Sequence, residues 1–193
     1  EMEKGIITIG RQYGSQGKAI GKKLAKKLGC TFYDKEELIK IARGRDYEEV
    51  RAFYEEQPVD SLLYAIAMNN AEREIEKIPF ARIRELCGVG PCVLIGRCGS
   101  EIFRGNRNAV SIFIHGDMEK RIQYVMETEG LSRNSARKKI SRTDEARTSF
   151  HRYYTHREWG RAEDYELCLD SSILGADRCV EAILGYLKIR ELI

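Results

Sequence analysis

The chain has 193 residues, 42% of them hydrophobic, which is enough for one domain with a sizeable core and argues against disorder. Its 33 basic and 30 acidic residues are mixed along the chain and give a net charge of only +3, so no basic face indicates nucleic-acid binding. No apolar run approaches the ~20 residues of a membrane helix and no signal peptide precedes Gly5, so we expect a cytoplasmic protein. We expect a single domain, 1–193, that binds small anionic molecules. Nothing in the sequence indicates a nucleic-acid, membrane or protein partner.

Short runs rich in Ile and Val alternate with long amphipathic stretches, which is typical of a parallel sheet covered by helices on both faces. We expect an α/β fold whose first helix spans 17–28, because Ile20, Leu24 and Leu28 share one face of it. The lysines of this segment fall largely on the other face and predict a solvated surface. The expected strands are 5–10, 31–34, 92–96, 109–115 and 165–170.

The segment between the first strand and the first helix, GRQYGSQGKAIG, has the composition of a phosphate-binding loop. A glycine-rich turn at a helix N-terminus points backbone N–H groups at one spot, where the helix dipole favours an anion. Gly14 and Gly17 permit the tight turn, and Lys18 can reach a bound phosphate. The alternative is an ordinary strand-to-helix loop with a solvent lysine, but strand, loop, lysine and helix occur in the order that phosphate binding requires.

This loop departs from the strict pattern G-x-x-x-x-G-K-[ST], in which the last hydroxyl binds Mg²⁺. The first glycine is replaced by Gln12, and Ala19 and Ile20 follow Lys18 where the hydroxyl is expected. Two alternatives remain for the metal. Either Ser15 takes over part of this role, or Mg²⁺ is held through water and the nucleotide alone.

Two long helical excursions interrupt the strands. The first, 35–90, is longer than a crossover requires and predicts a substrate-side subdomain. The second, 117–164, suggests a mobile lid that closes over phosphates, expels water and neutralises developing charge. This interpretation depends on its eight arginines, at 121, 133, 137, 142, 147, 152, 157 and 161.

Three charged residues are candidates for phosphate chemistry. Arg97 follows the strand 92–96, and in open α/β sheets the carboxyl ends of strands face the ligand crevice, where an arginine can grip a phosphate bidentately. Its position alone leaves open a plain surface arginine. Asp144 and Arg147 lie three residues apart on one helix face, and the alternative for them is an exposed ion pair worth only ~0.2–0.5 kcal/mol.

The remaining polar motifs have structural interpretations. Asp170, Ser171 and Ser172 precede the last predicted helix, and capping of this helix by serine is the simplest account. The six cysteines never form a C-x-x-C pair, so we interpret them as reduced thiols in the core rather than a metal or disulfide framework. The three histidines, at 115, 151 and 156, do not occur with other metal-binding residues at a typical ligand spacing. We interpret them as structural or surface residues. No protein metal site is therefore expected.

Together these pieces resemble the cytidylate kinase-like family, a branch of the P-loop nucleoside monophosphate kinases, over nearly the whole chain. The resemblance implies a three-layer P-loop NTPase-type fold, a five-stranded parallel sheet flanked by helices, with a helical acceptor-binding region near 35–90 and a helical lid region near 117–164. The segments that carry it are ITIGRQYGSQGK, LGCTFYDKEEL, CVLIGRCG, DEARTSFHRYYT with the WG that follows, and DSSILG.

The resemblance also implies roles for matching residues. Arg97 would bridge donor and acceptor phosphates, Arg147 would bind a phosphate, and Asp144 would touch the acceptor ribose or orient the lid; with Lys18 they form the implied catalytic set. Asp34 and Lys40 would hold the acceptor monophosphate, Lys40 standing where an arginine is usual, and the segment after Asp170 would border the adenine. The donor phosphates of ATP would be held by Gly14, Ser15, Gln16, Gly17, Lys18, Ala19 and Ile20.

Two departures from the family pattern weaken the recognition of CMP. In true cytidylate kinases an aspartate follows the arginine of the Gly-Arg motif and helps to read cytosine, whereas Cys98 stands here. The serine after the aspartate of the second strand is replaced by Lys35.

The hypothesis that follows is in-line transfer of the ATP γ-phosphoryl group to a small phosphorylated acceptor, with a pyrimidine nucleoside monophosphate such as CMP or dCMP preferred. Because the acceptor phosphate is already ionised at neutral pH, positioning and positive charge suffice without a general base. ATP and Mg²⁺ are the expected cofactors, the metal held mainly through nucleotide and water. Two alternatives are a P-loop kinase for another metabolite and a non-catalytic nucleotide-binding protein derived from a kinase.

Overall fold

The computed structural model of the protein describes residues 5–42, 51 and 78–193, and the predicted acceptor-binding region therefore lies largely outside the described residues. A five-stranded parallel sheet forms the centre, with the strand order β2-β3-β1-β4-β5. All five strands predicted from the sequence are confirmed, and so is the α/β fold class. Their bounds are β1 Ile6–Arg11, β2 Thr31–Tyr33, β3 Cys92–Ile95, β4 Ala109–His115 and β5 Leu167–Asp170.

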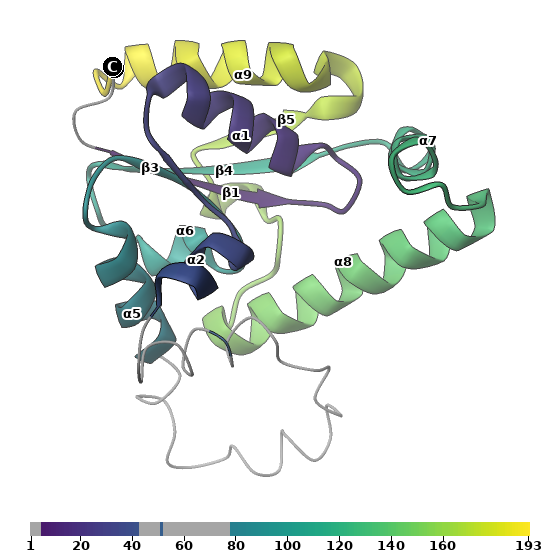
Figure 1. The fold of residues 1–193 in the computed structure, drawn as a ribbon, viewed down its shortest axis with the longest axis horizontal. Helices are drawn as coiled ribbons and strands as arrows, with labels where there is room; N and C mark the ends of the chain where they lie inside the picture. Colours follow the sequence, from purple (N-terminus) through teal and green to yellow (C-terminus); the bar gives the residue numbers. More distant parts are fainter. Residues whose placement is uncertain (1–4, 43–50, 52–77) are drawn as a thin grey trace.

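Helices cover both faces of the sheet, as the alternation of runs predicted (Figure 1). Because side chains alternate along a strand, Ile7 and Ile9 face the core shared with α1 (Gly17–Leu28) and α9 (Ser171–Ile189). The opposite face packs against α2 (Lys35–Ile41), α5 (Ile78–Cys87) and α6 (Gly99–Ile102). The sheet is thus the middle of three layers.

Helix α1 has the bounds that the periodicity predicts and ends at Gly29, whose positive φ of 65° suits a glycine. Its lysine face is exposed, as predicted, and two of the lysines have carboxylate partners on α9. The ammonium groups of Lys23 and Lys27 lie 2.6 Å from carboxylate oxygens of Asp177 and Glu181 on α9. These exposed pairs join the two helices of one layer but stabilise the fold by only ~0–1 kcal/mol each.

The arginine-rich excursion after β4 is a helical hairpin followed by a short 3-10 helix. The hairpin consists of α7 (Met118–Glu129) and α8 (Arg133–Thr155), and the chain then passes through η2 (Ala162–Asp164) into β5. A small apolar cluster at the interface of the two helices includes Ile122, Val125, Ala136 and Ile140, all buried. In Figure 1, α8 runs obliquely past the end of the sheet where α7 begins. Among the described residues, no helix is both long and apolar enough to cross a bilayer.

Candidate phosphate-binding site

The predicted site residues gather around the carboxyl ends of the central strands. The glycine-rich loop connects β1 to α1, Asp34 follows β2, and Arg97 comes two residues after β3. Parallel strands bring these ends to one edge of the sheet, which is where open α/β folds bind ligands. The hairpin of α7 and α8 adds Asp144 and Arg147 to the same region, because Asp144 contacts the loop directly.

The backbone of the loop has a conformation that leaves the start of α1 open to an anion. Gly14 has a φ of 78° and Gln16, the N-cap residue of α1, has a φ of 64°, both in the left-handed region. No side chain caps the first turn, so its N–H groups are available to a phosphate. Gly17 is required sterically, since a Cβ there would lie 2.6 Å from Cβ and Cγ of Arg11.

Ser15 has a structural role and does not replace the missing Mg²⁺ ligand. The residue is only 1% exposed, and its hydroxyl lies 2.8 Å from the carbonyl oxygen of Gln12 and 3.2 Å from that of Ile114. Because this hydroxyl is turned into the protein, the expectation that it takes over part of the metal site is wrong. The described residues also contain no group of three or more His, Cys, Asp or Glu side chains that could hold a metal.

Lys18 is held by two carboxylates from the end of β2 and the start of α2. Its ammonium lies 2.9 Å from both Asp34 and Glu36. Burial opposes ionisation of Asp34, but hydrogen bonds from the backbone of Glu37 and from Lys18 outweigh it, so the pKa of Asp34 lies below its usual value. The same two carboxylates raise the pKa of Lys18. Asp34 and Lys18 therefore pair as charged groups at neutral pH.

Lys40, the other predicted acceptor residue, occupies the last turn of α2. It is exposed, and its ammonium lies 2.7 Å from Glu37 on the preceding turn. Such an exposed i,i+3 pair is weak and can exchange for a ligand at little cost.

Asp144 joins α8 to the phosphate loop and to α7. One carboxylate oxygen accepts a hydrogen bond of 2.8 Å from the backbone N–H of Tyr13, and the other lies 2.6 Å from the guanidinium of Arg121. That guanidinium also donates to the carbonyl oxygen of Tyr13, at 3.2 Å. The interpretation of Asp144 and Arg147 as a plain surface ion pair is therefore wrong, because the carboxylate binds the loop and a different arginine.

Arg147 lies one turn further along α8 and faces the same loop. Its guanidinium donates to the carbonyl oxygen of Arg11 at 2.9 Å and stands 5.5 Å from the ring centroid of Tyr13. Burial lowers the pKa of Arg147 to about 10; Asp144 opposes this change, and the positive charge of Arg97 adds to it. Arg147 remains a cation at neutral pH in a place that would accept an anion.

Arg97 reaches the same helix from the sheet. Its guanidinium carbon lies 4.3 Å from the ring centroid of Phe150, which is three residues from Arg147 on α8. Two cations, one from the end of β3 and one from α8, are therefore brought into each other's electrostatic range beside the glycine-rich loop. Like charges brought this close repel, and a bound phosphate would relieve the repulsion by pairing with both.

Arg121 and Tyr13 are site residues that the sequence interpretation missed. Arg121 was one of eight arginines with no distinguishing motif, yet it is only 6% exposed. The sequence did indicate that Arg121 is buried. Met118 and Val125 stand three residues before it and four after it, and this helical spacing places Arg121 on the apolar face of α7. An arginine on such a stripe needs a buried partner, which here is Asp144.

Cys98 is a buried core residue. The residue is 5% exposed, has a φ of 59°, and packs in the core with Leu94 and Phe103. Burial raises the pKa of its thiol, which stays neutral. The position that reads cytosine in true cytidylate kinases therefore contributes packing in this chain.

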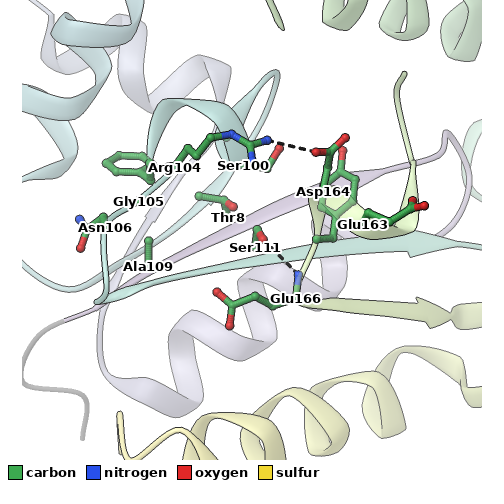
Figure 2. Close-up of a pocket in the computed structure, with 13 residues that line it drawn as sticks. Thr8, Ser100, Arg104, Gly105, Asn106, Ala109, Ser111, Glu163, Asp164 and Glu166 are labelled. Atoms are coloured by element: carbon green, nitrogen blue, oxygen red, sulfur yellow. Dashed lines mark hydrogen bonds and ion pairs between the residues drawn. The ribbon is translucent and has the colours of Figure 1, made fainter. Parts of the chain in front are cut away.

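A hollow of about 230 Å³ lies on the α6 face of the sheet between η2 and the start of β4 (Figure 2). Its walls are polar. Arg104 lies 3.2 Å from Oδ1 of Asp164, and Ser111 accepts a hydrogen bond from the backbone of Glu166, whereas the buried Oδ2 of Asp164 has no hydrogen-bond partner. None of the residues predicted to bind phosphate lines it. At the other end of β5, Asp170 is the N-cap residue of α9 and accepts a hydrogen bond from the backbone N–H of Ser172. The prediction that a serine caps this helix is therefore wrong, because the capping side chain is the aspartate.

Comparison with known proteins identifies the fold. The profile of the cytidylate kinase-like family matches residues 6–173. An uncharacterized protein from Eubacterium ventriosum has 27% identity and a TM-score of 0.75, the match covering 96% of this chain and 99% of that one. A gluconokinase from Sinorhizobium meliloti 1021 and a shikimate kinase from Acinetobacter baumannii in complex with shikimate are each 16% identical, with TM-scores of 0.56 and 0.55 and coverage of 99% of this chain and 96% of theirs. These two show the fold alone, that of P-loop kinases, and no curated protein matches.

Proposed function

The chain belongs to the cytidylate kinase-like family, and from this premise we propose that it transfers the γ-phosphoryl group of ATP to the phosphate of a small acceptor, a pyrimidine nucleoside monophosphate such as CMP or dCMP in the first instance. The observation that supports this most strongly is the pair of arginines beside the loop. Arg97 and Arg147 approach it from β3 and α8, and the pKa of Arg147 is lowered to about 10 by burial and by its neighbour's charge.

The chemistry requires little more than placement and charge. The loop backbone and the start of α1 would hold the donor phosphates, while Arg97 and Arg147 would pair with the transferred group and the acceptor phosphate. Mg²⁺, held through the nucleotide and water because Ala19 and Ile20 offer no hydroxyl, would neutralise charge on the β- and γ-phosphates. Lys18 would exchange its carboxylate partners for phosphate oxygens when the donor binds.

A second candidate is phosphoryl transfer to a hydroxyl group of another metabolite. It is favoured by the ionised carboxylate of Asp34, which lies at the end of β2 and pairs with Lys18 2.9 Å away. With Glu36 these three groups carry a net charge of −1, which disfavours a dianionic acceptor phosphate but suits a hydroxyl that donates to a carboxylate.

The distinguishing experiment measures ADP release from ATP and Mg²⁺ across a panel of nucleoside monophosphates and hydroxylated metabolites. Turnover with CMP or dCMP, reduced by the variant Asp34→Asn by less than tenfold, is the result expected from the first candidate. Turnover only with a hydroxylated compound, abolished by the same variant, would replace it with the second. ATP binding without turnover on any acceptor would favour a non-catalytic descendant of a kinase.

A further inference from the structure

Tyr13, in the phosphate loop, contacts both α7 and α8. Its backbone N–H donates to Asp144 at 2.8 Å, and its carbonyl oxygen accepts from Arg121 at 3.2 Å. Its hydroxyl donates to the carboxylate of Glu129 at the end of α7. Its ring faces the guanidinium of Arg147 at 5.5 Å. Both polar backbone groups of one loop residue are thus satisfied by side chains from two neighbouring helices.

The ion pair that makes these contacts is costly to break. Arg121 and Asp144 lie 2.6 Å apart, with 6% and 18% of their side chains exposed. Removing one partner would leave the other charge poorly solvated. The same arginine also supports the loop through its backbone, since a Cβ on Gly14 would lie 3.0 Å from the carbonyl oxygen of Arg121. The pair therefore touches the loop at two consecutive residues, and any shift of α7 or α8 would be transmitted to them.

We propose that Arg121 and Asp144 are positioning residues that hold the phosphate loop in its anion-binding conformation through the two backbone groups of Tyr13. The loop, α7 and α8 are then held together before any ligand binds. The hydrogen bond between Asp144 and Tyr13 also positions the part of α8 from which Arg147, one turn further along, faces the loop. This differs from the mobile lid expected from the sequence. The proposal rests on the proposed function only in naming the ligand, a nucleoside triphosphate bound through its phosphates.

Hydrogen–deuterium exchange of the loop tests whether Arg121 and Asp144 hold it in place, independently of any activity. In the variants Asp144→Asn and Arg121→Met, the amides of residues 12–17 should exchange ~tenfold or more faster than in the parent protein, because a charge-assisted hydrogen bond is lost. The matched control is Glu145→Gln, an exposed carboxylate next to Asp144 on the same helix, and it should leave exchange unchanged. Parent-like exchange of these amides in both variants would overturn the proposal.

The variant Arg121→Met carries the risk of global unfolding, so Arg121→Lys provides a milder test. Lysine keeps the charge, but its ammonium ends one bond short of the guanidinium nitrogen that contacts both Asp144 and the carbonyl oxygen of Tyr13. Exchange of residues 12–17 should be intermediate, while the amides of β1 and β4 stay protected. Faster exchange spread evenly over the sheet would mean a loss of overall stability and would contradict a local positioning role.

Nucleotide affinity gives the second readout. Titration calorimetry of Asp144→Asn should show ~tenfold weaker binding of ATP but unchanged binding of adenosine, since only the triphosphate contacts the loop. Equal losses for both ligands would contradict the positioning role. If the parent protein binds no ATP, the proposed function fails. The exchange experiment still decides whether Arg121 and Asp144 hold the loop.

Discussion

Replacing Arg147 by methionine separates its contribution to stability from its contribution to catalysis. The variant loses the hydrogen bond of 2.9 Å to the carbonyl oxygen of Arg11, a loss of ~1.5–3 kcal/mol for a charged donor. It also removes a cation that is unfavourably placed, because a pKa lowered to about 10 corresponds to roughly 3 kcal/mol of burial and repulsion. The two effects nearly cancel, so we expect the free energy of unfolding to change by no more than ~1 kcal/mol.

Catalysis should respond very differently, because the charge is needed where negative charge develops during transfer. Loss of such a group lowers kcat by ~10²–10³. The assays are ADP release at saturating substrates and thermal unfolding, in which ~1 kcal/mol moves Tm by about 2–4 °C for a domain of this size. The control is Arg142→Met, an exposed arginine on the same helix, which should change neither quantity. A kcat within threefold of the parent, or a loss of stability above ~3 kcal/mol, would refute the reasoning.

Three further predictions concern the loop and the buried histidine of α8. Gly17→Ala should weaken ATP binding at least ~tenfold, because the new Cβ would meet Cβ of Arg11 at 2.6 Å and force the loop to shift; unchanged affinity by calorimetry would contradict this. Ser15→Ala should lower the free energy of unfolding by only ~0.5–1.5 kcal/mol, because the carbonyl groups of Gln12 and Ile114 lose the hydroxyl but keep their backbone donors, and it should leave the Mg²⁺ dependence of turnover unchanged; a raised Mg²⁺ requirement would show instead that the hydroxyl is a ligand. Burial lowers the pKa of His151, so below the ordinary histidine pKa of ~6.5 the unfolded chain binds a proton that the folded protein does not, and stability should fall as the pH drops from 7 towards 5 by up to ~1.4 kcal/mol per unit. In His151→Gln, the free energy of unfolding measured with denaturant should fall less steeply as the pH drops. An equal pH dependence in the variant and the parent protein would show that His151 is not the group responsible.

The parts of the fold that follow from local pattern were predictable. The Ile and Val runs mark the strands because a parallel sheet is buried on both faces, and Ile20, Leu24 and Leu28 mark α1 because they recur at helical spacing. A helix cap at the start of α9 was predictable too, although the capping residue is Asp170 and not a serine. In each case the signal lies in residues close in sequence, even though the strands are stabilised by burial against distant segments.

The parts that failed depend on contacts between distant segments. Asp144 meets Arg121, 23 residues away, and Tyr13, 131 residues away, so no local pattern could choose these partners over Arg147 at i+3. The role of Ser15, left open between two alternatives, could not be decided locally either, because its hydroxyl donates to the carbonyl of Ile114 on the neighbouring strand. The burial of Cys98 depends on how α6 packs beneath the sheet. Sequence reasoning named the loop and the arginines that the structure brings together, but not the network of side chains that contacts them.

The central claim, that the site transfers a phosphoryl group between bound anions, depends most directly on Arg97. The decisive measurement is kcat for acceptor-dependent ADP formation by Arg97→Ala beside the parent protein, with thermal unfolding recorded on the same samples. We expect kcat to fall at least ~10²-fold, because the arginine would bridge donor and acceptor phosphates, while Tm shifts by only a few degrees. Normal turnover by this variant would contradict the account.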